Sequence, residues 1–573
     1  MTIKSLLRLC CAVCLLIAGT AFSAPPNILF IAVDDLNDWI GCLGGHPQTK
    51  TPNFDRLAKS GVLFTNAYCA AASCNPSRSA VFSGRPPHCS GLYQNMQKMR
   101  EVMPEAELLP RYFSRHGYWS AGSGKMLHYV IDPPSWDDYF PDKAKDDPFP
   151  RTFYPKKRPV NLPRGGPWQY VETDWAAIDV TDEEFGGDWS VTKWIGEQLG
   201  HKHEKPFFLA CGLYRPHEPW FVPKKYFEPF PLETIQTGPG VKEGDLDDVP
   251  PLGQKLARNR YFAHIQAQKQ WKQGIQAYLA SIHFADAMLG RVLDALETSP
   301  HRDNTIVVLW SDHGWHLGEK EHWQKFTGWR ACARVPLMVR VPKGTAGLPE
   351  GTKAGSVCSR PVSIVDLFST LTELCGLPKK ADIESRSLVP LLSDPAAAWS
   401  HAAITHLDHP QNYALSTERW RYIHYLDGGE ELYDIETDPH EWTNLASKPE
   451  HAEKLVQMRS LVPKQIVPVH ESQPGINAFV PEVELAPVTG VEPPNSKAGG
   501  KSVRLLFQNH RQTPVKLVWL DENGARHARG ELQLASRRLM STFAGHTWLL
   551  LDESDKALGH VVVPGKPARV KIE

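Results

Sequence analysis

The sequence predicts an α/β fold in which a large, mostly parallel sheet lies between helices, followed by a small antiparallel subdomain and a separate β-sandwich domain. Continuous apolar runs of strand length recur with helical segments between them, as in strands buried on both faces of a parallel sheet. From about Ala402 the pattern changes to short alternating strands joined by turns. The length of 573 residues exceeds what one compact core usually holds, so two or three domains are expected.

The first 23 residues have the pattern of an export signal. Lys4 and Arg8 precede an apolar run from Leu9 to Phe22, and small residues favour cleavage after Ser23. The run is short for a bilayer span, although a retained anchor is the alternative. No later segment is apolar enough to cross a bilayer, so we expect no integral membrane segment in the mature chain. We expect a secreted or periplasmic protein, where disulfides are permitted but their pairing is not fixed by the sequence.

Three apolar runs are the expected core strands. They cover residues 27–33, 207–211 and 305–310. Helices are expected from Thr51, as a cap with Pro in the first turn, and between His264 and Leu296, where the apolar residues have helical periodicity. Polar residues that follow parallel strands belong at the carboxyl edge of the sheet, where ligands bind in open α/β folds.

The second half divides into smaller parts. Short strands are expected around 404–406, 421–425 and 431–434, and a helix at 449–461. An Asn523-Gly524 pair marks a hairpin near the C-terminus. The expected divisions are a signal at 1–23, the α/β domain at 25–400, the antiparallel subdomain at 401–470, a Pro-, Gly- and Ser-rich linker at 471–501, and the β domain at 502–573.

The overall charge excludes one class of partner. The chain has 63 basic and 64 acidic residues, a formal net charge of -1. No global field attracts nucleic acid or an anionic membrane, so we expect no nucleic-acid partner. Recognition of a charged substrate must therefore be local.

Acidic and imidazole side chains follow the expected core strands. Asp34 and Asp35 follow the first strand, and Asp312 and His313 follow the third. Carboxylates that converge on one edge repel unless a cation holds them, and oxygen ligands favour a hard cation such as calcium or magnesium. For each pair taken alone, a helix cap or turn is the more frequent role.

The most specific pattern begins at Cys74. The segment Cys-Asn-Pro-Ser-Arg at 74–78, with Gly84-Arg85 after it, resembles the modification signature of the sulfatase family. The resemblance implies that Cys74 is oxidised to formylglycine by a formylglycine-generating or other sulfatase-maturing enzyme, and that the hydrated aldehyde is the nucleophile. A buried cysteine ahead of a helix explains neither Pro76 nor the two arginines.

The local physics suits such a nucleophile. Pro76 and Ser77 can start a helix, which puts residue 74 at a helix N-terminus, where partial positive charge favours an anion. Arg78, one turn later, can hold the modified side chain. A geminal diol has one hydroxyl to attack sulfur and a second whose loss of a proton expels sulfate as the aldehyde reforms.

The resemblance extends from about Pro26 to Leu461 and implies an alkaline phosphatase/sulfatase-like fold. His rather than Asn after Asp312 makes the chain look closest to the iduronate-2-sulfatase branch. The resemblance implies one Ca²⁺ ion held by Asp34, Asp35, Asp312 and His313, with the modified Cys74 as a further metal-binding residue, although histidine is a soft ligand for calcium. It further implies that the positive charges of Arg78, Lys125 and Lys325 neutralise the negative charge on the sulfate oxygens. The implied leaving-group acid is His217, with Lys325 as a possible helper, and the implied base that releases sulfate is His128. Taken singly, each of these lysines and histidines is more often a surface charge.

The substrate implied by this branch is a sulfated carbohydrate that contains uronic acid, such as a glycosaminoglycan. A basic and aromatic loop with Lys156-Lys157-Arg158, Arg164 and Trp168 can grip an anionic polysaccharide or simply be solvated. Two rivals stay open. One is a phosphatase or phosphonate monoester hydrolase of the same superfamily, and the other is a non-catalytic glycan-binding protein.

The C-terminal segment resembles a second family. Residues 515–520, Asn523-Gly524 and 542–549 are similar to the β domain of the von Hippel–Lindau protein. In that family, residues at the positions of His546 and Trp548 help to bind hydroxyproline in a peptide, but other parts of that pocket are not evident here. A docking or attachment β-sandwich with a peptide or glycan ligand is favoured, and a stabilising appendage is about equally compatible.

Overall fold

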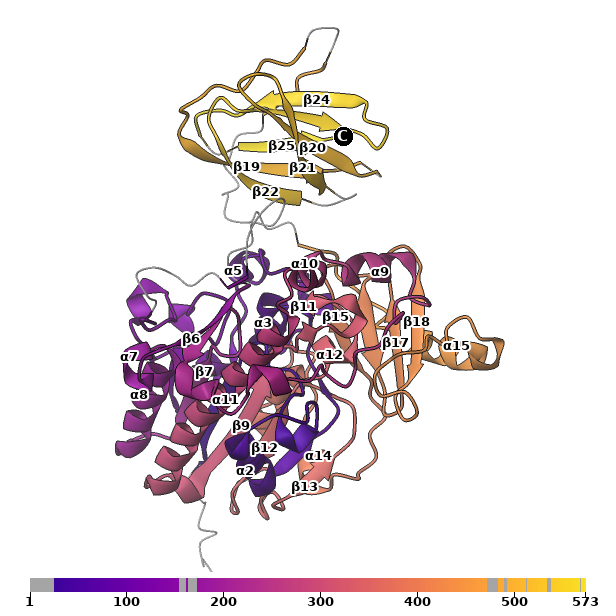
Figure 1. Cartoon of the computed structure of the whole chain (residues 1–573). Coiled ribbons are helices and arrows are strands. Elements are labelled where there is room, and N and C mark those ends of the chain that lie inside the picture. The colour runs from indigo at the N-terminus through magenta and orange to yellow at the C-terminus, as the bar shows by residue number, and fades with distance from the viewer. Residues whose placement is uncertain are drawn as a thin grey trace, which may run out of the picture. The chain divides into compact units, whose positions relative to one another are not determined.

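The computed structural model describes residues 25–153, 161–162, 173–470, 483–488, 492–511, 513–532, 537–566 and 568–573 (Figure 1). These residues separate into two compact units. The first holds the described residues up to His470 apart from 96–98, and the second holds 96–98 with the described residues beyond 470. Three expectations lie outside the described residues: the signal at 1–23, the loop carrying Lys156-Lys157-Arg158, Arg164 and Trp168, and parts of the linker at 471–501.

The first unit is built on an eight-stranded sheet with the order β13-β2-β12-β9-β1-β7-β4-β5. Every pairing is parallel except those of β12, so the expected mostly parallel sheet is confirmed. The strands are β1 Asn27–Val33, β2 Val62–Phe64, β4 Trp119–Gly124, β5 Asp138–Phe140, β7 Phe207–Leu213, β9 Thr305–Ser311, β12 Leu337–Arg340 and β13 Ser356–Cys358.

Helices cover both faces of this sheet (Figure 1). Alternate side chains of β1 enter opposite cores: Leu29 and Ile31 enter one, Ile28 and Phe30 the other. This two-sided burial explains why the run at 27–33 is apolar without interruption. One core is closed by α2 Pro52–Ser60, α8 Asp188–Gly200 and α11 Trp271–Thr298, and the other by α3 Cys74–Ser83, α6 Leu109–Arg115 and α13 Leu367–Leu374.

Two local expectations need correction. The helix expected from His264 begins only at Trp271, because Lys269 has a left-handed φ of 55° after the separate helix α10 Tyr261–Ala267. The Thr51 side chain does not cap α2, since its hydroxyl accepts a hydrogen bond from the Gly41 N–H at 2.8 Å. The carboxylate of Asp286 accepts from the first turn of α2 instead.

An antiparallel sheet completes the first unit. Its order is β15-β16-β17-β18, and β16 is a strand that the sequence pattern did not reveal. One face packs on the main body through Ile423 and Tyr433, and the other is covered by α15 through Leu455 and Met458. The elements are β15 Ala403–His406, β16 Tyr413–Ser416, β17 Trp420–His424, β18 Glu430–Asp434, the 3-10 turn η9 Pro449–His451 and α15 Ala452–Ser460.

The second unit is a β structure made of two sheets, with orders β22-β19-β25 and β21-β20-β23-β24. Their apolar faces share one core that includes Phe507, Leu517 and Trp548. The predicted Asn523-Gly524 turn joins β20 to β21, with Gly524 at φ 81°. The strands are β19 Ser502–Asn509, β20 Val515–Leu520, β21 Arg526–Leu532, β22 Arg537–Phe543, β23 Thr547–Leu551, β24 Ala557–Val562 and β25 Ala568–Ile572.

All eight cysteines in the described part of the chain are free thiols. Among the described residues, no helix combines the length and apolar character needed to span a bilayer.

Candidate active site

Two neighbouring strands bring four predicted residues to one place. Strands β1 and β9 pair in parallel, with Val33 opposite Ser311, so the residues that follow them emerge side by side. Asp34, Asp35, Asp312 and His313 are all fully buried there. Asp35 has a left-handed φ of 58°, which costs a non-glycine residue about 1–2 kcal/mol. Its amide donates to Asp312 Oδ1 at 3.2 Å.

Cys74 faces this acidic group from the other side. It is the first residue of α3, next to the N-cap Ser73, so the partial positive charge of the helix N-terminus acts on it. Its Sγ lies 3.1 Å from Lys325 Nζ, 3.2 Å from His313 Nε2 and 3.6 Å from Lys125 Nζ. Three groups that can be cationic therefore surround a fully buried thiol.

Arg78 links the two acidic pairs. It lies one helical turn after Cys74, and its Nε donates to Asp312 Oδ2 at 2.7 Å while Nη2 donates to Asp34 Oδ1 at 3.0 Å. Its remaining nitrogen donates to the carbonyls of Lys125 and Met126. The hydrogen bonds of this guanidinium thus hold the carboxylates, whereas the sequence suggested that it would hold the side chain of residue 74.

The two lysines each bind one aspartate. Lys125 Nζ donates to Asp34, and Lys325 Nζ donates to Asp35 Oδ1 at 2.9 Å. Lys325 follows the short strand β11 Trp323–Gln324, which pairs with β10 His316–Leu317. This small hairpin explains how a residue far along the chain returns to the sheet edge.

The two predicted histidines flank the thiol. His217 lies after β7, its Nδ1 contacts the Glu218 carbonyl at 2.6 Å, and its Nε2 is 3.7 Å from Asp35 Oδ2. Burial lowers the pKa of His217, but the carboxylates of Asp35 and, less strongly, Asp34 oppose this, and the net shift is upward. Burial lowers the pKa of His128, and a hydrogen bond with Cys74 offsets this only in part. His217 is therefore the more readily protonated of the two.

Burial and neighbouring charges shift the pKa values of several side chains in the site. Burial alone would raise the pKa of Cys74, but Lys125, Lys325 and His313 hold it well below its usual value. Burial raises the pKa of Asp312 to about 6 in spite of Arg78. Burial opposes protonation of His313, yet Asp312 together with Cys74 raises its pKa to about 9. The positive charges around Cys74 therefore favour its negatively charged form.

The donor set fits a cation. Asp34, Asp35 and Asp312 offer oxygens that lie within 4.8 Å of one another, and Cys74 forms similar groups with Asp312 and His313 and with Asp35 and His217. Asp35 Oδ2 is buried without a hydrogen-bond partner, as expected of an atom meant for an ion. His313 is oriented by its Nδ1, 3.0 Å from the Gly314 carbonyl, so that Nε2 faces the thiol.

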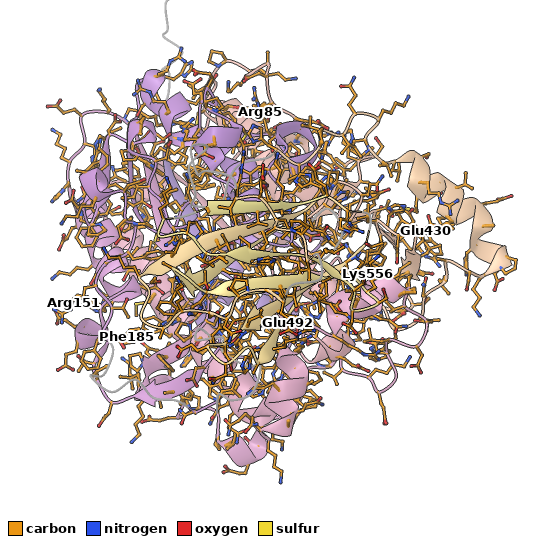
Figure 2. The ribbon with its side chains drawn as sticks, turned by 90° about the horizontal axis from the view of Figure 1, so that it is seen from above. Arg85, Arg151, Phe185, Glu430, Glu492 and Lys556 are labelled. Atoms are coloured by element: carbon orange, nitrogen blue, oxygen red, sulfur yellow. The ribbon has the colours of Figure 1, made fainter. Side chains whose placement is uncertain are left out.

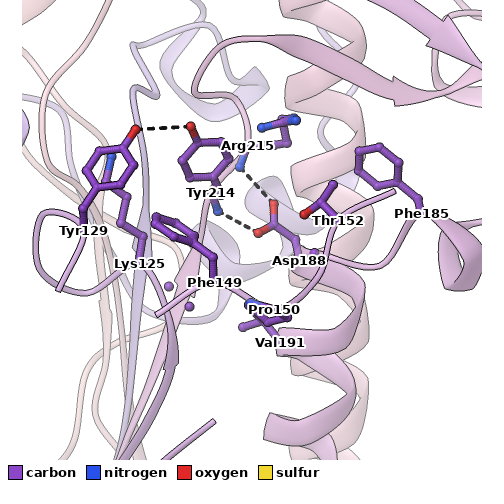
Figure 3. Close-up of a pocket in the computed structure, with 13 residues that line it drawn as sticks. Lys125, Tyr129, Phe149, Pro150, Thr152, Phe185, Asp188, Val191, Tyr214 and Arg215 are labelled. Atoms are coloured by element: carbon purple, nitrogen blue, oxygen red, sulfur yellow. Dashed lines mark hydrogen bonds between the residues drawn. The ribbon is translucent and has the colours of Figure 1, made fainter. Parts of the chain in front are cut away.

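A cavity of about 260 Å³ adjoins the site, with Lys125 in its wall (Figure 3). The Lys125 ammonium lies 5.0 Å from the ring centre of Tyr129 and 5.4 Å from that of Tyr214. The Asp188 carboxylate accepts hydrogen bonds from the amides of Tyr214 and Arg215 and fixes that loop. Sequence reasoning missed these residues, although Tyr129 directly follows His128 and Tyr214 shortly precedes His217.

This geometry agrees with the comparisons with known proteins. The family model "Sulfatase" matches residues 26–377, the model "N-sulphoglucosamine sulphohydrolase, C-terminal" matches 318–471, and the "VHL beta domain" model matches 495–561. The chain belongs to the sulfatase family. It is accordingly a sulfuric ester hydrolase, and members of this family generally use a formylglycine and a divalent metal ion.

Individual proteins are similar to this chain in sequence or in fold. A "Sulfatase" of Formosa agariphila is 39% identical over 458 residues, which cover 77% of this chain and 86% of that protein. The "Iduronate 2-sulfatase" of Homo sapiens is 32% identical over 393 residues, 61% of this chain and 69% of that protein. The phosphonate monoester hydrolase of Agrobacterium radiobacter shares the fold, with a TM-score of 0.61 at 22% identity over 76% of this chain and 95% of that one.

Proposed function

We propose that this sulfatase removes sulfate from a sulfated carbohydrate that contains uronic acid, using a formylglycine made from Cys74 and one Ca²⁺ ion. The observation that carries the proposal is the position of Cys74. It lies at a helix N-terminus, within 3.6 Å of two lysine ammonium groups, opposite three buried carboxylates. An ordinary buried cysteine has no need of such surroundings.

The ion and the modified residue would supply the chemistry that side chains lack. Asp34, Asp35, Asp312 and His313 would hold the ion beside residue 74, where it would polarise the sulfate oxygens. The hydrated aldehyde would supply two hydroxyls on one carbon, one for attack on sulfur and one for the release of sulfate.

The chain's own residues have distinct proposed tasks. Lys125 and Lys325 neutralise the charge on the sulfate oxygens, because their ammonium groups already converge on Cys74 Sγ. Arg78 contributes to that positive field and keeps Asp34 and Asp312 in place. His217 gives a proton to the departing sugar oxygen, and His128 accepts the proton of the second hydroxyl.

The cavity beside Lys125 is the proposed place for the sugar. Phe149 packs against both Tyr129 and Tyr214, with ring centres 5.3 Å apart in each case. Aromatic faces of this kind stack on the C–H faces of pyranose rings. A cavity of about 260 Å³ is large enough for one ring, which suits a terminal or looped-out sugar.

Export, maturation and the further domains belong to the same proposal. We infer secretion or export to the periplasm after cleavage at Ser23. Cys74 has no exposed surface, so a maturing enzyme would have to act before the first unit has folded. The catalytic domain would comprise 25–400 and the antiparallel subdomain 401–470, and 502–573 would be a docking domain for a peptide or glycan.

The experiment that tests the function compares matched esters. Initial rates on the sulfate and phosphate esters of one phenol should favour the sulfate ester. A panel of sulfated oligosaccharides, with released sulfate as the readout, should then give the highest rate on those containing uronic acid. A preference for the phosphate ester would identify a phosphatase instead. Binding of the oligosaccharides without any turnover would identify a glycan-binding protein.

A further inference from the structure

A second cluster of metal-ligating side chains lies outside the active site, just beyond the helix that carries Cys74. It is formed by His88 and Cys89, in the short helix α4 Pro87–Ser90, and by Glu384. We propose that these three side chains bind a zinc ion.

The ligand atoms converge as a metal requires. The imidazole, thiol and carboxylate atoms all lie within 4.8 Å of one another. His88 Nε2 is 3.4 Å from Glu384 Oε1, and Cys89 Sγ is 2.6 Å from Glu384 Oε2. With bonds of about 2.0–2.3 Å to each atom, one zinc ion can be reached by all three after small side-chain rotations. Because Glu384 is about half exposed, the fourth position of the ion is open to water.

A buried neighbour orients the histidine. His88 Nδ1 lies 2.9 Å from Nε2 of His406, which is fully buried at the end of β15. This contact leaves Nε2 of His88, which faces Glu384, as the nitrogen that can bind an ion. Second-shell partners that fix the ring in this way are usual for histidines that bind zinc.

A backbone hydrogen bond also holds the segment around Glu384 close to the chain that leads into α4. The Glu384 amide donates to the carbonyl of Gly84, which ends α3, at 2.8 Å. One residue further, Arg85 makes a 2.7 Å ion pair with Asp382 at the surface of the first unit (Figure 2). The site is therefore positioned before any ion arrives, and an ion would link α4 to the segment around Glu384.

The charges favour a borderline-soft divalent ion. Cys89 Sγ and Glu384 Oε2 lie 2.6 Å apart, so a thiolate and a carboxylate at these positions would repel each other. A divalent cation removes that repulsion, and its binding replaces the thiol proton, which is released to the solvent. Sulfur and nitrogen ligands select zinc over calcium, in contrast to the mainly oxygen set at the active site.

Cobalt titration of the full chain tests the site, because Co²⁺ bound to a thiolate gives a near-ultraviolet charge-transfer band. Cys74 can also meet an ion together with Asp312 and His313, so the titration uses the Cys74→Ala protein. This protein is first freed of metal with a chelator under reducing conditions and then given excess Ca²⁺, which occupies the active-site carboxylates. We expect a band that saturates at one Co²⁺ per chain and is lost when one equivalent of Zn²⁺ is added. A further Cys89→Ser change should abolish it, and a Cys42→Ser change at another half-buried thiol should leave it intact.

A second variant separates binding from folding. Glu384→Gln removes the charge of a half-exposed side chain, and it should weaken Co²⁺ binding at least about tenfold while the thermal midpoint of the metal-free protein stays unchanged. With excess Ca²⁺ present to occupy the active-site carboxylates, added Zn²⁺ should raise the midpoint of the Cys74→Ala protein but not that of the protein carrying both Cys74→Ala and Cys89→Ser. Absence of the band in the Cys74→Ala protein, or its persistence after Cys89→Ser, would overturn the proposal.

Discussion

Cys74 and Lys325 meet across the carboxyl edge of the sheet, with Lys325 Nζ 3.1 Å from Cys74 Sγ although 251 residues separate them in the chain. The same ammonium donates to Asp35 Oδ1 at 2.9 Å. A single positive group thus joins the proposed nucleophile to the proposed metal ligands.

Removal of the nucleophile should abolish turnover. We predict that Cys74→Ala lowers kcat on a sulfate ester by about 10³-fold or more, as expected for loss of an attacking group. Initial rates on an aryl sulfate measure this. Cys211→Ala, a change at another fully buried cysteine in the middle of the sheet, is the matched control and should keep most of the activity. Equal losses in the two variants would indicate a packing effect rather than a chemical one.

The contact between Arg78 and the two aspartates should matter for stability as well as rate. In Arg78→Ala, the buried Asp34 and Asp312 lose a partner, so thermal or denaturant unfolding should show a loss of about 3–5 kcal/mol. Arg56 makes a similar 2.7 Å pair with Asp294, but both side chains are largely exposed, so Arg56→Ala should cost only about 0–1 kcal/mol. Similar losses in the two variants would contradict this assignment.

Calcium removal should reversibly stop the enzyme. The orphaned Asp35 Oδ2 and the clustered carboxylates predict that a calcium-selective chelator lowers activity to background and that added Ca²⁺ restores it. Asp35→Asn should weaken Ca²⁺ binding, measured by calorimetry, by at least about tenfold, because one ligand loses its charge. Full activity of chelated protein that contains no detectable divalent ion would contradict the calcium assignment.

The two histidines should differ in their dependence on the leaving group. If His217 protonates the departing oxygen, His217→Asn should slow esters of poor leaving groups much more than esters of acidic phenols. His128→Asn should slow both classes alike, since its proposed step follows departure of the alcohol. His283→Asn, at a half-buried histidine that contacts the Lys50 carbonyl, is the control and should slow neither. A uniform loss in His217→Asn would remove it from that role.

The cavity should bind the sugar of the substrate rather than its sulfate group. Phe149→Ala removes one aromatic wall, and we predict a higher KM for a sulfated oligosaccharide with little change for a small aryl sulfate. Phe153→Ala, a nearby change at a residue that is 36% exposed and does not line the cavity, should affect neither substrate. An equal effect of Phe149→Ala on both substrates would mean that the cavity does not bind the sugar.

Much of the architecture could be predicted because it depends on local patterns. The apolar run at 27–33 is strand β1 as expected, and its two-sided burial explains why it has no polar alternation. The break between α10 and α11 at Lys269 could not be predicted, since a single left-handed residue interrupts a stretch that otherwise has helical periodicity. Strand β16 was missed because all four of its residues, Tyr413–Ser416, are buried, so the sequence shows no alternation of apolar and polar residues there.

The candidate site also contains some features that the sequence predicted and others that it did not. The place of Asp34, Asp35 and Asp312 at the sheet edge follows from the strands before them, but their role as metal ligands was predicted only from the family resemblance, and Cys74 was predicted from its motif. The aromatic wall beside Lys125 could not be predicted, because the directions of Tyr129 and Tyr214 depend on how two separate loops pack. The hydrogen bonds of Arg78 to two aspartates are likewise a tertiary feature.

Mass spectrometry of the peptide that contains residue 74, from enzyme shown to release sulfate, tests the central claim most directly. The account predicts that the cysteine has lost hydrogen sulfide and gained oxygen, and that the fraction of modified chains rises in proportion to kcat across preparations. Fully active enzyme in which residue 74 remains an unmodified cysteine would contradict it.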